Sequence, residues 1–175
     1  MIRTTLDNVH IKRTLRELYG HTQSTPKDCL LDPAWDRSVQ IFPGMVAMNK
    51  ATNAAGASDV VTLIDATGVP YGLFGEFIGG YGIDEPQMRG VNATPVWVLT
   101  AGSEFEVLAP AFDTAATWTF PTNGTPLFVH AGTAGATRGK LVPAGAGGAS
   151  TAPIGRVLSR PSTDRLVISG LTPVS

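Results

Sequence analysis

Two glutamates on one predicted strand come closest to the spacing of a catalytic pair. In "SEFEVL", Glu104 and Glu106 share one face of an extended chain, and Phe105 and Val107 share the other, because side chains alternate along a strand. Two neighbouring carboxylates can work as an acid–base couple. The same alternation is typical of a strand with one solvated face and one core face, and we favour this second interpretation.

The other reactive residue types do not form a recognised catalytic or metal-binding pattern. The histidines, His10, His21 and His130, lie far apart, and the single cysteine, Cys29, provides neither a disulfide nor a metal cluster. The sequence also lacks a Gly-x-Ser-x-Gly nucleophile motif and a phosphate-binding loop with its lysine. We therefore predict a protein that is not an enzyme, with no catalytic residue, no metal and no cofactor.

A glycine-rich run, "GVPYGLFGEFIGGYG" at residues 68–82, is the remaining candidate for ligand binding. Its one charged residue, Glu76, is negative and would repel a phosphate group. We interpret the run as a strand in which Gly72 and Gly75 allow close packing against a neighbour, followed by a glycine-rich turn.

One short segment favours an enzyme. The stretch "YGIDEPQMRGVNATPV" resembles the nucleotide-specificity hairpin of trimeric dUTP pyrophosphatases. By that resemblance Asp84 would hold the catalytic water, and Arg89 and Gly90 would flank the base pocket. The sugar-stacking tyrosine, the Arg-Ser-Ser phosphate motif and the glycine-rich tail of those enzymes are missing, so a nucleotide hydrolase stays a minor alternative.

The charge pattern points to a partner for the protein surface. Only 15% of the 175 residues are charged and 43% are hydrophobic, which favours a folded chain whose surface is partly covered. The net charge of −1 divides into +1 for residues 1–37, −5 for 38–112 and +3 for 113–175. These opposite charges could attract each other within one chain or between copies in a ring.

Other classes of partner find no support in the sequence. Basic clusters with interleaved aromatics are absent, which argues against nucleic acid. No apolar run approaches the roughly 20 residues of a membrane helix. The N-terminus also lacks the apolar core of a signal peptide, so we expect no export.

The first 38 residues are predicted to form an N-terminal arm. Apolar residues at helical spacing predict a short helix at about 8–19, and "HTQSTPKDCLLDPAWDRS" predicts an extended connector at 21–38. Such an arm can reach a partner or fold back on its own domain, and the sequence leaves both open. The candidate apolar contacts with a partner or another subunit are Ile11, Leu15, Leu18, Leu30, Leu31 and Trp35. We consider Trp35 the best single anchor, because a large aromatic in a polar segment needs a place to be buried.

Residues 39–175 are predicted to form a β domain. Short apolar runs separated by Gly, Pro, Asn and Asp predict an all-β fold, a small barrel or β-tulip of short antiparallel strands. A Gly–strand–strand–loop–Pro-x-Gly order occurs twice, which suggests two related β units at 39–110 and 118–171. The sequence does not decide between one barrel and two lobes.

Taken whole, the β region resembles the capsid decoration (cement) proteins of tailed bacteriophages. The resemblance covers residues 39–171 and rests on the segments "FPGMVAMN", "VVTLIDATGVPYGLFGEF", "TPVWVLTAGSEFEVL" and "APIGRVLSRPSTDRLVISGL". It implies a structural virion protein, made in the host cytoplasm and located on the outer surface of the expanded capsid. By the same resemblance its partners would be the major capsid protein and further copies of itself in a homotrimer. Another phage virion module, such as a head fibre base or a tail-associated part, is the alternative.

Overall fold

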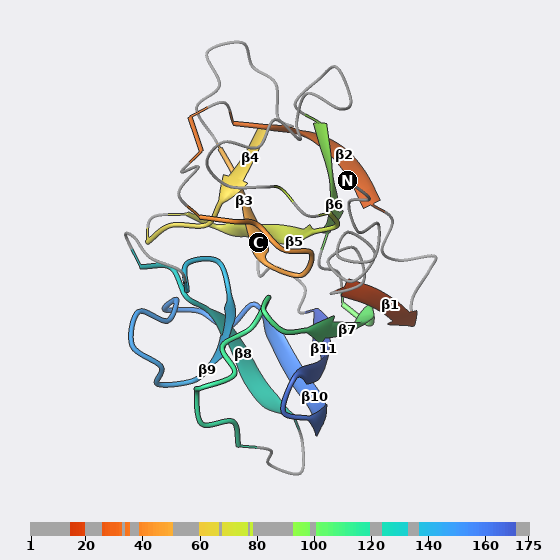
Figure 1. Cartoon of the computed structure of the whole chain (residues 1–175), viewed down its shortest axis with the longest axis vertical. Helices are drawn as coiled ribbons and strands as arrows, with labels where there is room; N and C mark the ends of the chain where they lie inside the picture. Colours follow the sequence, from red (N-terminus) through yellow and green to blue (C-terminus); the bar gives the residue numbers. More distant parts are fainter. Residues whose placement is uncertain are drawn as a thin grey trace, which may run out of the picture.

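The fold is entirely β in the part of the chain that the structure describes. This computed structural model describes residues 15–19, 26–32, 34–35, 39–50, 60–66, 68–76, 78, 93–98, 101–119, 124–132 and 137–170. The all-β prediction is confirmed. Two sheets, one closed and one open, lie one above the other along the long axis of the molecule (Figure 1).

Eleven strands make up these sheets. They are β1 (Leu15–Tyr19), β2 (Pro26–Leu31), β3 (Val46–Asn49), β4 (Val60–Leu63), β5 (Pro70–Phe74), β6 (Ala93–Val98), β7 (Glu104–Leu108), β8 (Thr125–Val129), β9 (Leu141–Pro143), β10 (Gly155–Ser162) and β11 (Arg165–Gly170).

The upper sheet in Figure 1 is a small barrel with the strand order β2-β4-β3-β5-β6. Its neighbours are antiparallel except β2 and β4, which run parallel with Leu30 opposite Val60. The barrel closes where β2 also pairs with β6, and Leu30 lies opposite Ala93 there. Closure satisfies the backbone donors and acceptors of every strand edge, so short strands of four to six residues can form a stable barrel.

The lower sheet is open and has the order β1-β7-β11-β10-β8-β9. Its centre is the hairpin of β10 and β11, which turns at residues 163–164. The register of this hairpin shifts between Val157 and Ser159, so Leu158 is the extra residue of a β-bulge. Strand β7 lies between β11 and β1, and β1 forms one edge of the sheet.

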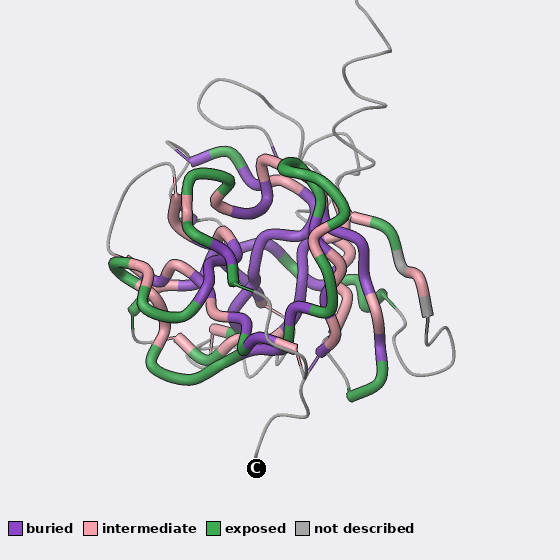
Figure 2. The backbone as a smooth tube through the Cα atoms, turned by 90° about the horizontal axis from the view of Figure 1, so that it is seen from below, coloured by how far each residue is buried: buried purple, intermediate pink, exposed green. Residues whose placement is uncertain are grey.

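One hydrophobic core joins the two sheets. Buried side chains of the barrel, such as Leu73 and Phe74, and of the open sheet, such as Leu127 and Ile168, belong to a single cluster. In Figure 2 the buried segments occupy the middle of the molecule and the exposed ones lie around them. The barrel and the open sheet therefore bury their apolar faces against each other.

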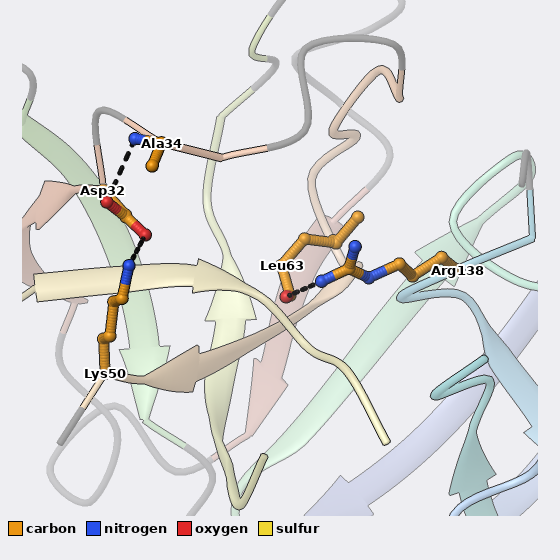
Figure 3. Close-up of polar contacts among 5 residues, drawn as sticks. All are labelled: Asp32, Ala34, Lys50, Leu63 and Arg138. Atoms are coloured by element: carbon orange, nitrogen blue, oxygen red, sulfur yellow. Dashed lines mark hydrogen bonds and ion pairs between the residues drawn. The ribbon is translucent and has the colours of Figure 1, made fainter. Parts of the chain in front are cut away.

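A turn at residues 137–139, between β8 and β9, ties the open sheet to the barrel. The Gly139 carbonyl accepts a hydrogen bond from Val46 N–H at 2.8 Å. Arg138 donates from Nε to the Ile64 carbonyl at 2.8 Å. It also donates from Nη2 to the Leu63 carbonyl at 3.0 Å (Figure 3). Gly139 has a φ of 79°, and a Cβ there would lie 2.3 Å from Leu63 Cδ1, so glycine is required.

The predicted N-terminal helix is wrong for residues 15–19, which form β1. This strand pairs with β7, with Leu15 opposite Val107 and Arg16 opposite Glu106. The pairing gives hydrogen-bond partners to the backbone groups along the edge of β7, which would otherwise be unpaired there. This gain outweighs the helical preference that the spacing of the apolar residues indicates. Residues 8–14 of the predicted helix lie outside the described residues.

The predicted connector is also corrected, because residues 26–31 are the barrel strand β2. Cys29 and Leu31 point into the barrel, while Asp28 and Leu30 are exposed. The two predicted units do not coincide with the two sheets either. Strand β7 falls within 39–110 but pairs in the open sheet. A duplication of the two units stays a prediction.

Both Pro-x-Gly segments begin strands, as expected. A Cβ on Gly72 would lie 2.4 Å from the Trp97 carbonyl oxygen, and one on Gly155 would lie 2.4 Å from that of Ser169. Each glycine thus lets its strand approach the neighbouring backbone. The interpretation of Gly72 as a packing position, rather than part of a phosphate loop, is confirmed, and residues 79–82 of the run lie outside the described part.

Replacing Gly155 with Ala should lower the free energy of unfolding by about 1–3 kcal/mol, because the new methyl group meets a backbone oxygen that cannot move aside alone. Gly147→Ala is the matched control, since a Cβ there has nothing within 4 Å. Denaturant unfolding of both variants gives the comparison. Equal stabilities would contradict the close-approach interpretation.

Candidate interaction surfaces

The structure does not gather the six predicted contact residues on one surface. Leu15 and Leu18 are half-buried on β1 of the open sheet. Leu30, on β2 of the barrel, is 42% exposed. Ile11 lies outside the described residues. These positions therefore belong to separate sheets rather than to one continuous arm.

Leu31 and Trp35 are buried in the protein's own core. Their exposed fractions are 4% and 6%, and the Trp35 N–H donates to the Asp32 carbonyl at 3.0 Å. Of the two possibilities that the sequence left open for Trp35, the structure shows the fold-back onto its own domain. In this fold neither side chain is exposed to a partner. The prediction of Trp35 as an anchor on a partner is therefore corrected, because the side chain is buried in its own domain.

Three large apolar side chains are substantially exposed among the described residues. Leu30 on β2 is 42% exposed, Leu158 on β10 is 43% exposed, and Val69, just before β5, is 74% exposed. Single exposed apolar residues are ordinary on protein surfaces. Leu30 and Leu158 differ from Val69 because each lies on a strand next to outward-facing charge, with Asp28 two residues before Leu30 and Arg156 two residues before Leu158.

Glu106 sits between two arginines on the outer face of the open sheet. Its carboxylate lies 3.3 Å from Arg16 on β1 and 3.4 Å from Arg165 on β11. The predicted pattern of β7 holds, since Phe105 and Val107 are buried in the core. The outer face is less solvated than expected, because Glu106 is only 9% exposed. The arrangement indicates an ion cluster that links three strands, not an acid–base couple.

Asp32 and Lys50 form an ion pair that joins the end of β2 to the end of β3 (Figure 3). The Asp32 carboxylate also accepts the Ala34 N–H at 3.0 Å. Burial alone would raise the pKa of Asp32, but the hydrogen bonds from Lys50 and Ala34 and the charge of Lys50 together hold this pKa below its ordinary value of 3.8. The charged carboxylate therefore stabilises the barrel.

Within the described ranges, the residue types of an enzyme site do not come together. No group of three or more His, Cys, Asp or Glu residues there could hold a metal ion. Cys29 is a buried free thiol. Asp84, Arg89 and Gly90, the residues of the nucleotide-hydrolase alternative, lie outside the described residues. Among the described helices and strands, no helix is long and apolar enough to cross a membrane.

Sequence reasoning missed two features of these surfaces. Nothing in "LRELY" signals that Arg16 pairs with Glu106, because that contact joins segments about ninety residues apart. The exposed pair of Asp28 and Leu30 could have been found, since alternation along "DCLL" places them on one face. Interpreting residues 21–38 as a connector concealed that signal.

In the part of the chain that the structure describes, the protein is all-β, and the features described above lie on the surfaces of its strands. The chain belongs to the phage cement protein family, whose model matches residues 1–173. Members of this family are structural proteins of the phage capsid, so the location is the virion capsid, as the sequence resemblance implied.

A structural comparison supports the fold. A solved chain from "The capsid of Myoviridae Phage XM1" is similar with a TM-score of 0.56 and 13% sequence identity, over 87% of this chain and 86% of that one. At this identity the likeness concerns the fold alone. The search of curated proteins gives no match.

Replacing Asp32 with Asn should lower the free energy of unfolding by about 1–3 kcal/mol at neutral pH, because a charge-assisted hydrogen bond is lost. The folded-state pKa is lowered, so this contribution is complete above 3.8 and is lost as the pH falls from there through the folded-state pKa. Denaturant unfolding of the wild type and the variant should therefore show a difference that shrinks in acid.

The control is Asp113→Asn, which changes a half-buried carboxylate that accepts the Ala115 N–H at 2.9 Å in a solvent-exposed hydrogen bond. It should cost less than Asp32→Asn. A wild-type advantage over Asp32→Asn that stays constant from neutral to strongly acidic pH would contradict the role of the charged pair.

Proposed function

We propose that this protein binds the outer surface of the expanded phage capsid and cements neighbouring major capsid subunits. The observation that carries the proposal is the match of the cement family over residues 1–173. The fold likeness to a chain from a myovirus capsid structure supports it. No enzymatic step is part of this function.

The structure supports a cementing role through rigidity. A cement must resist the separation of the subunits it joins, so its own parts must not move apart. The shared core and the bonds from the 137–139 turn to the barrel meet this requirement. Apolar groups on both sheets, Leu30 on the barrel and Leu158 on the open sheet, give two separate points of contact.

The proposal includes self-association as a homotrimer and contact with the major capsid protein. Low charge supports extensive contact, because few charged groups need to lose their hydration. Residues 1–14, with Ile11, remain our candidates for an arm that contacts the capsid. The half-buried Leu15 and Leu18 are candidates for contact along the β1 edge.

Purified protein should cosediment with expanded capsids in a saturable way and should not cosediment with unexpanded capsids, because expansion creates the surface that a cement recognises. The measurement is the bound fraction against total protein for both capsid forms. Expanded capsids already saturated with unlabelled protein give the control. Binding to neither form, or equal and unsaturable binding to both, would contradict the proposed function.

A further inference from the structure

Two exposed strand faces carry the same pattern with opposite charge. On β2, Asp28 and Leu30 point outward, because Cys29 and Leu31 face the barrel interior. We call this pair the β2 patch. On β10, Arg156 and Leu158 are exposed on either side of the fully buried Val157. We call this pair the β10 patch.

The two patches are alike in sequence spacing and opposite in charge. In each, a charged residue precedes a leucine by two positions, and on the regular strand β2 this places both side chains on one face about 7 Å apart. On β10 the bulge at Leu158 interrupts this alternation, and what Arg156 and Leu158 share is their exposure. When such faces are laid together, the leucines can meet at the same time as the carboxylate meets the guanidinium. The leucines are 42% and 43% exposed, so each has apolar surface to bury.

The patches cannot meet within one molecule. The β2 patch is on the barrel and the β10 patch is on the open sheet, and β2 lies in the upper half and β10 in the lower half of the molecule in Figure 1. A contact between two like patches would place Asp28 on Asp28 or Arg156 on Arg156, which like charges oppose. The favourable contact joins unlike patches, the β2 patch of one copy and the β10 patch of another.

We infer that a second copy of this chain docks its β10 patch on the β2 patch, and that this contact builds the ring of the free protein. Net charge favours the same pairing. Residues 26–98, which include the barrel strands, carry four basic and eight acidic residues, a net of −4. Residues 15–19 and 101–170, which include all strands of the open sheet, carry six basic and five acidic residues, a net of +1. Head-to-tail contacts generate closed rings when the rotation between copies closes.

This inference rests on the self-association included in the proposed function and names its surface. Because the side chains of both patches are exposed, we expect the substituted proteins to fold. The test uses Asp28→Arg, Arg156→Glu and the double variant that combines them. Light scattering over a wide concentration range reports the oligomer, and thermal unfolding confirms that each variant is folded.

Each single variant should weaken self-association about tenfold or more, because like charges then face each other at the contact. The double variant should recover most of the wild-type association, since the charges are exchanged but still opposite. Leu30→Ser and Leu158→Ser should each weaken association as well. Val69→Ser is the matched control, because it removes the most exposed apolar side chain outside both patches and should have no effect.

Two results would overturn the inference. One is a wild-type protein that stays monomeric at every concentration. The other is a set of single variants that keep the wild-type oligomer. If those variants keep the oligomer but lose binding to expanded capsids, the patches contact the capsid protein and only this inference fails. A charge-dependent oligomer that does not bind capsids would instead contradict the proposed function alone.

Discussion

The contact between the barrel and the open sheet is the constraint on which the rest of the structure depends. Arg138 donates to two carbonyl groups at the end of β4, and Gly139 fits against Leu63 only because it lacks a side chain. Around this turn the buried faces of both sheets form one core, in which Trp97 and Phe105 meet edge to face with their ring centroids 5.8 Å apart. The outward faces of the two sheets are therefore held in a fixed relation, as two binding surfaces on one rigid body require.

The strands and turns of the chain could largely be predicted, because they depend on local sequence patterns. The pairing between the strands could not be predicted in this way. Alternation identified β7, and the Pro-x-Gly segments identified the starts of β5 and β10. Strand β1 was predicted as a helix because Leu15 and Leu18 fit a helical spacing. Its pairing with the edge of β7 is a long-range contact that a single sequence does not show. Trp118 lies in a loop, where its indole N–H donates to the Asp113 carbonyl at 2.8 Å.

The candidate surfaces were predicted only in part, for a physical reason. An apolar side chain in a polar segment signals burial without saying what buries it. For Trp35 and Leu31 the answer is the protein's own barrel, and for Leu30 the same strand leaves the side chain on the outside. The segregation of acidic and basic segments was visible in the composition. How these segments divide between the sheets required the fold, since Glu104 and Glu106 of the acidic segment lie on β7 of the open sheet. The structural role in the phage capsid followed from the family match, because the surfaces alone do not name a partner.

The central claim is that the protein stabilises the expanded capsid by binding across its subunits, and calorimetry of the shell measures this most directly. A ligand that binds the intact shell and not its separated subunits must raise the temperature at which the shell comes apart. Expanded capsids saturated with the protein should therefore disrupt at a higher temperature than bare ones, and the shift should grow with occupancy until the sites are filled. An unchanged disruption temperature at full occupancy would contradict a cementing function, even if the protein binds tightly.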